Sequence, residues 1–319
     1  MQLENIGMQN PEFEIEKGFV TEILRYIELN DVLHFKKVHQ SVLENIRSGA
    51  NKFTTFSRLL KTFFESKGVK SASVAGDYLR MVKDMRNEGK SFIKTKQYSC
   101  KSQHEAYLKV YSNPEVMGYY MNALLISQIL WTHHFKMLMF FGSQLDMPYL
   151  KSTQRVLDIG PGHGFFSHMV SSTLPFIDHV DIVDISVKSL EMTQAIIGEN
   201  NGKIKYFLKD VFDFDSSEQY DLIILGEVLE HLDQPLLILK KLKELLNPDG
   251  YLWITTPTNA PAIDHVFLFR SREEIKKLIE EAGLEVSIEF GCYAEEVTPE
   301  IAEKFSVSYL YGAFLQAKE

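Results

Sequence analysis

The sequence predicts an α/β protein in two parts, an N-terminal all-helical domain over residues 1–149 and a doubly wound, mostly parallel seven-stranded sheet over residues 150–319. Three observations lead to this fold class. The chain has 319 residues, which is enough for two domains. Helical periodicity dominates the first part, which has few glycine or proline breaks. From Arg155 onward, short apolar runs alternate with helical stretches.

Net charge separates the same two parts. Residues 1–150 carry 19 basic and 15 acidic side chains, whereas residues 151–319 carry 15 and 28. Residues 52–101 hold 12 Lys or Arg against 4 Asp or Glu, which favours a solvated helical surface, with a face for an acidic partner as the alternative. A chain with a formal charge of −9 is a poor general binder of nucleic acid.

Composition and cysteine content indicate the compartment. The chain is 45% hydrophobic and 24% charged, as soluble globular proteins are. Cys100 and Cys292 are the only cysteines, so neither a disulfide framework nor a CxxC metal site is expected. The N-terminal residues lack the basic and apolar regions of a signal peptide. The sequence therefore predicts a cytoplasmic protein.

The first part is expected to contain helices near residues 14–48, 54–67 and 73–88, and a fourth over about 113–141 that begins with an N-cap and a proline. Residues 116–132 are uncharged, but polar side chains interrupt them and a membrane span needs about 20 apolar residues, so a buried helix is predicted. The helical spacing of its aromatic residues favours core packing over a substrate-pocket wall for Tyr119, Tyr120, Trp131, Phe135, Phe140 and Phe141.

Seven strands are expected in the second part. Their alternation with helical segments is typical of β-α-β units and a mostly parallel sheet. No helix is assigned between the last two strands, and a final antiparallel strand inserted in the sheet fits that spacing. The strands are expected at residues 155–159, 180–184, 204–208, 221–225, 251–256, 284–290 and 306–317.

A glycine-rich loop follows the first strand, which ends at Asp158. In VLDIGPGHGFFSHMV, Gly160, Gly162 and Gly164 let the backbone approach a ligand closely. The loop does not match the dinucleotide fingerprint G-x-G-x-x-G, which disfavours NAD. Asp184 ends the next strand 20 residues after Gly164, where a doubly wound fold places a carboxylate on the ribose hydroxyls.

These motifs, together with KDVFDF, YDLIILGEVLEHL and NPDGYLWITTPTNAPAIDH, resemble the class I S-adenosylmethionine-dependent methyltransferases over about residues 150–319. The resemblance implies a Rossmann-like fold and S-adenosyl-L-methionine as the cofactor. It implies that Asp184 holds the ribose and that Asp210 and Val211 flank the adenine. Leu225 to Glu227 would close the site. The methionine part of the cofactor would lie against Asp158, Gly160, Gly162 and Gly164.

The first part resembles, more loosely, the helical domain that caps the substrate site of many small-molecule O-methyltransferases. That resemblance implies a lid over a small-molecule substrate and a homodimer formed through the helical domain. No winged-helix pattern of that family is found in residues 1–110. A substrate carried on coenzyme A or a carrier protein would account for the basic segment.

A second cluster of polar residues follows the fourth strand. If Glu227, Glu230 and His231 form a helical turn, positions i, i+3 and i+4 share one face, and His265 follows the next strand at the same rim. Mixed carboxylate and imidazole ligands suit Mg²⁺, Mn²⁺, Fe or Zn²⁺. The arrangement also resembles the metal-dependent branch of the superfamily, which includes ubiquinone-pathway O-methyltransferases and small-RNA 2′-O-methyltransferases. The alternative is a metal-free site.

Methyl transfer to an oxygen, or next to a carbon, of a small or carrier-bound metabolite is the leading functional hypothesis. The reaction is a direct displacement that needs an aligned nucleophile and a base. His231 is the preferred base and His265 the second, with Glu230 beside them; with a metal bound, the histidines become ligands. For His133 and His134, packing or capping is favoured over catalysis, and His163 faces either a ligand or solvent.

Two other classes of function remain as alternatives. RNA 2′-O-methylation is suggested by the metal-branch resemblance, but the net charge of −13 on residues 151–319 opposes it. A non-catalytic protein that binds S-adenosylmethionine is the other. The glycine loop and Asp184 indicate cofactor binding, whereas Glu227, Glu230 and His231 favour turnover.

Overall fold

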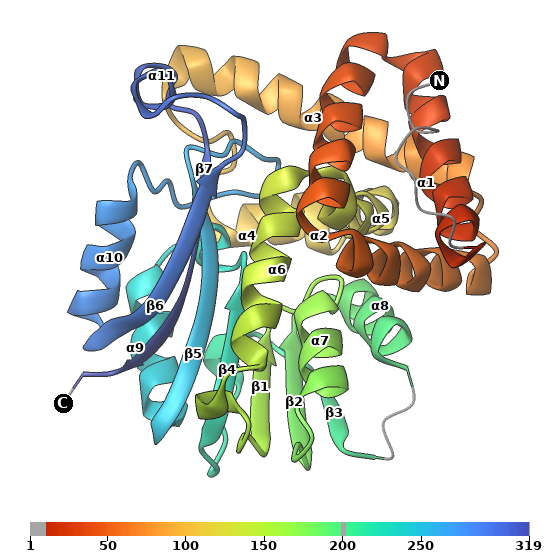
Figure 1. The fold of residues 1–319 in the computed structure, drawn as a ribbon. Helices are drawn as coiled ribbons and strands as arrows, with labels where there is room; N and C mark the ends of the chain where they lie inside the picture. Colours follow the sequence, from red (N-terminus) through yellow and green to blue (C-terminus); the bar gives the residue numbers. More distant parts are fainter. Residues whose placement is uncertain (1–10, 199–201, 319) are drawn as a thin grey trace.

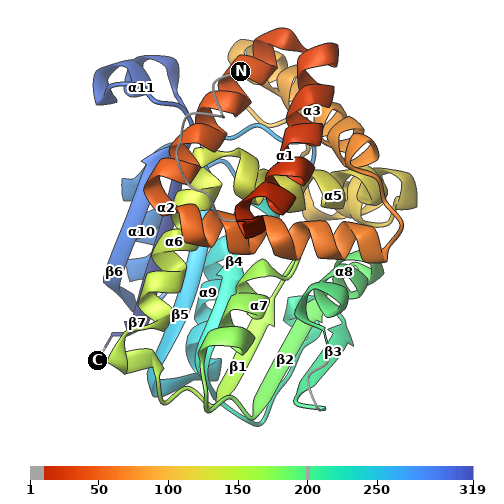
Figure 2. The same ribbon diagram turned by 45° about the vertical axis from the view of Figure 1, so that its right-hand side comes forward.

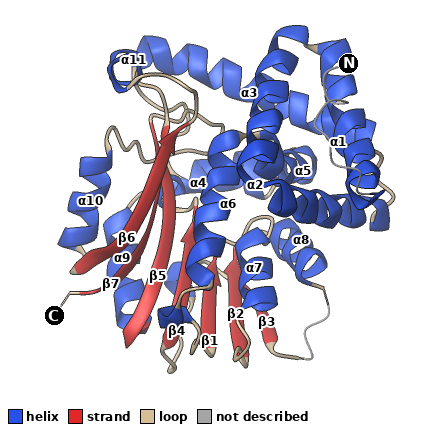
Figure 3. Cartoon of the chain, viewed as in Figure 1, coloured by secondary structure: helices blue, strands red, loops and turns tan. Residues whose placement is uncertain are grey.

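The computed structural model describes residues 11–198 and 202–318, in which a helical part lies over one end of a seven-stranded sheet (Figures 1 and 3). The strand order is β3-β2-β1-β4-β5-β7-β6, and β7 is antiparallel to both of its neighbours. This confirms the predicted fold class and the inserted antiparallel strand. The strands are β1 (Arg155–Ile159), β2 (His179–Asp184), β3 (Ile204–Leu208), β4 (Tyr220–Gly226), β5 (Leu246–Thr258), β6 (Leu284–Tyr293) and β7 (Tyr309–Ala317).

Helices cover both faces of the sheet, because successive apolar side chains of a buried strand point to opposite faces. In β1, Val156 packs into the cluster on one face and Leu157 into the cluster on the other. The first face is covered by α7 (Phe165–Thr173) and α8 (Val187–Ile197) (Figure 2). The second is covered by α9 (Pro235–Leu245) and α10 (Arg272–Glu281).

The helical part divides at other positions than the periodicity predicts. The expected helix 14–48 is interrupted at Asp31, and the expected break near residue 50 is a kink at Gly49 inside one helix. The expected helix 113–141 begins as predicted but is interrupted at Trp131, whose backbone is extended. The helices are α1 (Pro11–Asn30), α2 (Val32–Ser66), α3 (Ser71–Thr95), α4 (Gln103–Ala106), the π-helix η2 (Tyr107–Tyr111), α5 (Pro114–Leu130) and α6 (Thr132–Leu145).

The two parts share one hydrophobic core. Helix α6 leaves the helical part and runs along the sheet, where the Phe141 ring lies 5.1 Å from the Trp253 ring and 5.8 Å from the Phe314 ring. Phe56 of α2 also packs edge-on against Phe165 of α7, at 5.0 Å. The expected domain boundary at residues 149 and 150 therefore stays a prediction.

The C-terminal strands differ from the expected ranges. Strand β5 begins at Leu246 rather than at 251, and β7 begins at Tyr309 rather than at 306. A short helix, α11 (Pro299–Phe305), stands before β7, capped by the Thr298 side chain. Within the described residues, no helix has the length and apolar character that crossing a membrane requires.

Asp31 is expected to stabilise the junction of α1 and α2. Its side chain accepts a hydrogen bond from the His34 N–H at 3.0 Å and pairs with Arg86 at 2.5 Å, and these contacts hold the pKa of Asp31 below its ordinary value. Asp31→Ala should lower the free energy of unfolding by about 1 kcal/mol, whereas Asp31→Asn keeps a capping side chain and loses only the charge.

The contribution of this charge should depend on pH. A lowered folded-state pKa stabilises above the unfolded-state pKa, and the effect is lost as pH falls through the folded-state value. Urea unfolding of wild type and Asp31→Asn from neutral to acidic pH measures it. The difference between the two proteins should shrink at acidic pH, and a pH-independent difference would contradict the assignment.

Candidate functional site

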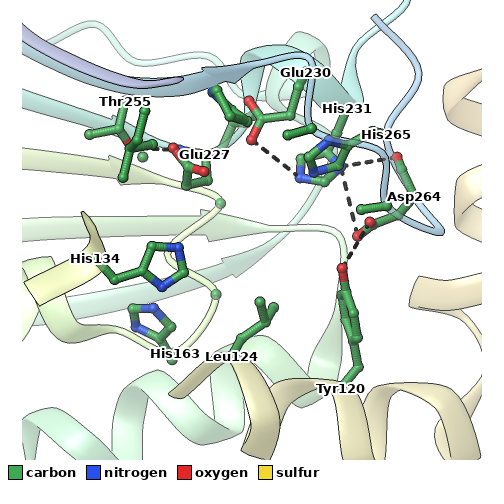
Figure 4. A pocket seen from close by; sticks show the side chains of 18 of the residues that line it. Tyr120, Leu124, His134, His163, Glu227, Glu230, His231, Thr255, Asp264 and His265 are labelled. Carbon is green, nitrogen blue, oxygen red and sulfur yellow. Dashed lines mark hydrogen bonds and ion pairs between the residues drawn. The ribbon is translucent and has the colours of Figure 1, made fainter. Parts of the chain in front are cut away.

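A cavity of about 720 Å³ lies between the helical part and the ends of β1, β2, β4 and β5. These are the carboxyl ends of the parallel strands, where open α/β sheets bind ligands. The sheet contributes the glycine loop, Asp184 and the residues after β4, while α2, α3, α5 and α6 contribute the opposite wall. Figure 4 shows labelled side chains from both sides pointing into this space.

The three predicted glycines have left-handed backbones but different surroundings. A Cβ on Gly162 would meet open space, and Gly162 lines the cavity. A Cβ on Gly160 would lie 2.7 Å from Val228 Cγ2. A Cβ on Gly164 would lie 2.7 Å from Thr193 Cα, so Gly164 permits close packing of α7 on α8 and is outside the cavity lining.

Two more predicted cofactor residues lie behind the cavity wall. The carboxylate of Asp158 is 1% exposed and accepts a hydrogen bond from Ser167 Oγ at 2.5 Å, while burial raises its pKa to about 7. Leu225 is fully buried in the core on the α9 face of the sheet. These two side chains support the loops at the ends of β1 and β4 rather than face a ligand.

Asp184 lines the cavity, as predicted. It accepts hydrogen bonds from the Ser186 N–H at 2.7 Å and from Ser189 Oγ. Burial raises its pKa to about 6 against the opposing effect of these bonds. Asp210 and Val211 line the same end, where Asp210 Oδ2 accepts from Gln103 Nε2 of α4 at 3.1 Å.

The helical turn considered for residues 227–231 forms only in its second half. Glu227 has a left-handed backbone (φ 54°), and Leu229–His231 form a 3₁₀ turn, η5. Glu227 is instead drawn toward β5, where its N–H donates to Thr255 Oγ1 at 3.0 Å. Among the described residues, the metal-binding atoms that converge within 4.8 Å belong to Glu230, His231 and His265, and Glu227 stands outside this group.

Backbone hydrogen bonds bring His265 to Glu230. The N–H groups of Val266 and Phe267 both donate to the Glu230 carbonyl at 2.8 Å, which ties the loop after β5 to η5. The His231 and His265 rings lie 4.9 Å apart, centre to centre, and His231 Nε2 lies 3.8 Å from Glu230 Oε1 (Figure 4). Residues from two separate loops thus form one cluster.

The cluster contains buried ionisable groups whose pKa values are shifted and some of whose polar atoms lack hydrogen-bond partners among the described residues. Burial, with the neighbouring Glu227, raises the pKa of Glu230 well above its ordinary value, and burial raises that of Glu227 to about 7. Burial lowers the pKa of His265 to about 4. Glu230 Oε2 accepts from Thr256, but Glu230 Oε1, Glu227 Oε1 and His265 Nδ1 have no hydrogen-bond partner in the described part of the chain. Buried polar atoms normally have partners, so these fit a cation or a polar ligand.

Three further histidines face this space, two from α6 and one from the glycine loop. His133, His134 and His163 all line the cavity, and Figure 4 shows His134 beside His163. Burial lowers the pKa of His133 and His163 to about 4, and burial also holds the pKa of His134 well below its ordinary value. His134 Nδ1 lies 2.9 Å from Ser127 Oγ and 3.2 Å from Gln128 Nε2, so His134 contacts polar side chains in the last turn of α5 and also lines the cavity.

The predicted aromatic series divides between core and cavity. Phe135 and Phe141 are fully buried, as expected, whereas Tyr120 and Trp131 line the cavity.

Tyr111 was not among the predicted site residues. It lies in η2, and its hydroxyl oxygen contacts His231 Nδ1. A single tyrosine outside any site motif gives no sequence pattern that would have identified it. In the basic segment, Arg80 pairs with Glu115 at 2.8 Å and Arg86 pairs with Asp31.

Comparison with known proteins identifies the central part of the chain. Residues 135–289 match the family model of a methyltransferase domain. A ubiquinone biosynthesis O-methyltransferase of Actinobacillus pleuropneumoniae is 31% identical over 32% of this chain and 45% of its own length. A mitochondrial one of Candida albicans is 31% identical over 33% of each chain. The chain thus spans less than half the length of these relatives.

Two solved structures share the fold over more than the sheet alone. The mitomycin 7-O-methyltransferase has a TM-score of 0.51 at 13% identity, covering 77% of this chain and 70% of its own. An O-methyltransferase family protein from Burkholderia thailandensis has a TM-score of 0.50 at 14% identity, covering 78% and 74%. At this identity the likeness concerns the fold, and it confirms the expected helical part beside a Rossmann-like sheet.

Gly164→Ala should destabilise the protein more than an alanine at another left-handed glycine. Both Gly164 (φ 73°) and Gly68 (φ 67°) are left-handed, but a Cβ at Gly68 meets open space. Gly68→Ala should cost about 1–2 kcal/mol for the backbone alone. Gly164→Ala should cost about 1–3 kcal/mol more, because the Cβ meets the Thr193 backbone. Equal costs in urea unfolding would refute the packing role.

Proposed function

We propose that this chain, which carries a methyltransferase domain over residues 135–289, transfers the methyl group of S-adenosyl-L-methionine to an oxygen of a small molecule. The observation that carries the proposal is that one cavity joins two sites. Gly162 and Asp184 line one end of it, and the Glu230, His231 and His265 cluster lines another wall. A cofactor and an acceptor bound in this cavity would therefore lie side by side.

The cofactor fits the end of the cavity near β1 and β2. The open space above Gly162 lets the backbone approach the methionine part, and Asp184 offers its carboxylate to the ribose hydroxyls. Val211 and Asp210 would border the adenine, with Gln103 of α4 closing over them. The two similar ubiquinone-biosynthesis proteins are O-methyltransferases by name, which supports oxygen as the acceptor atom.

His231 is the proposed base when no cation is bound. Its Nδ1 lies 3.0 Å from the carbonyl oxygen of Asp264. A carbonyl only accepts, so Nδ1 carries the proton and Nε2 keeps its lone pair toward the cluster. That nitrogen can take the proton of an acceptor hydroxyl while the chain holds that hydroxyl in line with the methyl group.

The donor set also fits a divalent cation. Glu230, His231 and His265 supply one carboxylate and two imidazoles whose ligand atoms lie within 4.8 Å of one another, and Glu230 Oε1 and His265 Nδ1 are buried without a hydrogen-bond partner in the described part of the chain. Such a set suits transition-metal ions, and Mg²⁺ when water completes the shell. A bound cation would lower the pKa of an acceptor hydroxyl and neutralise Glu230.

The helical wall supports a small, uncharged acceptor group rather than a nucleic acid. Met117, Met121 and Met137 line it with Leu124, and the nearby histidines are held neutral by burial. Arg86 at its edge is already paired with Asp31. Among the described residues that line the cavity, Lys37 is likewise paired, with Glu295, which disfavours a role for these cations in binding single-stranded RNA.

Cofactor affinity should depend on the ionisation of Asp184. Its pKa of about 6 means that the carboxylate is increasingly protonated below pH 6, and a protonated carboxyl accepts the two ribose hydroxyls less well. The dissociation constant for S-adenosylmethionine, measured by calorimetry, should rise about tenfold per pH unit below that value.

Asp184→Asn should bind weakly at every pH, and the exposed Asp249→Asn should behave as wild type. Absence of binding to the wild-type protein would refute the cofactor assignment. A pH-independent affinity would refute the role of Asp184 alone.

Substitutions in the cluster should reduce methyl transfer without reducing the affinity for S-adenosylmethionine. His231→Ala should retain S-adenosylmethionine affinity and lose methyl transfer to catechol-type acceptors. Elemental analysis of the purified protein should find divalent metal that Glu230→Gln and His265→Gln lose and His133→Gln, on the opposite wall, keeps. If no metal is found and the protein still transfers methyl groups after chelation, the cation assignment is refuted and His231 stays the proposed base. Normal methyl transfer by His231→Ala would refute the assignment of His231 as the base.

A further inference from the structure

Two tyrosines of the helical part reach across the cavity to one carboxylate of the sheet part. Tyr111 OH of η2 donates to Asp264 Oδ2 at 3.1 Å, and Tyr120 OH of α5 donates to Oδ1 of the same carboxylate at 3.1 Å (Figure 4 shows Tyr120). Asp264 is 2% exposed and stands beside His265 in the loop after β5. Both oxygens of this buried carboxylate therefore depend on donors from the helical part.

The same contacts hold His231. The Tyr111 oxygen lies 2.9 Å from His231 Nδ1, and the Asp264 carbonyl oxygen lies 3.0 Å from it. Because the hydroxyl proton of Tyr111 goes to the carboxylate, its oxygen is left to accept from the Nδ1 proton, as the carbonyl does. His231 is thereby fixed as the Nδ1–H tautomer, with Nε2 facing Glu230 and His265.

We propose that Tyr111 and Tyr120 are positioning residues that complete the cation site from the helical side, by fixing Asp264 and through it His231. The inference rests on the proposed function, because it assigns these tyrosines to the cluster that would hold the cation. Hydrogen bonds to the outer nitrogen of a ligating histidine orient the ring and tune its affinity for metal. In this protein, the hydrogen-bond partners that would orient the ligating histidine include Tyr111 and Tyr120, which belong to the helical part that covers the cavity.

A purely structural role does not require this geometry. Tyr119, next to Tyr120 on α5, donates to Asp84 of α3 at 2.6 Å and so bonds within the helical part. Tyr120 instead spans the cavity to a loop that follows β5. Packing of the helical part against the sheet would consequently be coupled to cation binding. By thermodynamic linkage, a bound cation would stabilise this packing, and the packing would raise the affinity for the cation.

The test measures binding of Mn²⁺ alone to the full chain, by the electron paramagnetic resonance signal of free Mn²⁺. Tyr111→Phe and Tyr120→Phe should each weaken binding by about 10- to 100-fold, as loss of outer-shell partners does. Tyr119→Phe is the matched control and should leave Mn²⁺ affinity unchanged. Thermal melting without metal reports whether each variant folds and how much stability each hydroxyl contributes.

Nitrogen-15 NMR of the histidines gives a second readout, with His231→Gln to assign the resonances. His231 of the metal-free wild type should show the Nδ1–H tautomer, and Tyr111→Phe should populate the other tautomer. Unchanged Mn²⁺ affinity in both folded tyrosine variants, or an Nε2–H tautomer in wild type, would overturn the inference. If wild type binds no Mn²⁺, the cation assignment fails, and the NMR result alone decides whether the tyrosines position His231.

Discussion

The site depends on the point between β1 and β4 where the chain changes from one face of the sheet to the other. From β1 the chain continues through α7 on one face, and from β4 it continues toward α9 on the other. The two loops therefore diverge and leave a crevice between them. The glycine loop and η5 border this crevice, and the helical part closes it above.

Desolvation determines the chemistry inside the crevice. Closing the space removes water from Asp184, Glu227 and Glu230, and burial raises the pKa of each. The same burial keeps His133, His163 and His265 neutral. Burying neutral imidazoles and carboxylates of raised pKa in this cavity costs free energy. Binding of hydroxyl groups or a cation would offset that cost.

Local patterns predicted the strands of the sheet and the position of Gly162 and Asp184 at one end of the cavity, because strand periodicity, the glycine loop and Asp184 are contiguous signals. They failed where the contact is distant or the backbone unusual. The left-handed conformation of Glu227 removes it from the cluster, although its spacing suits a helical turn. Tyr111 joins His231 across 120 positions, so no motif in the sequence could report it. Gly164 matches the motif but serves helix packing.

The continuous core that α6 builds with the sheet limits how far the two parts can separate. A swing of the whole helical part would expose Phe141 and Trp253, which bury on the order of 150–250 Å² each, at a cost of several kcal/mol. At the rim, Lys37 of α2 meets Glu295, before α11, in an ion pair whose side chains are 67% and 56% exposed. Exposed pairs contribute about 0–1 kcal/mol. The exposed pair at the rim thus contributes far less to holding the two parts together than the shared core does, so separation of the two parts as rigid bodies is disfavoured.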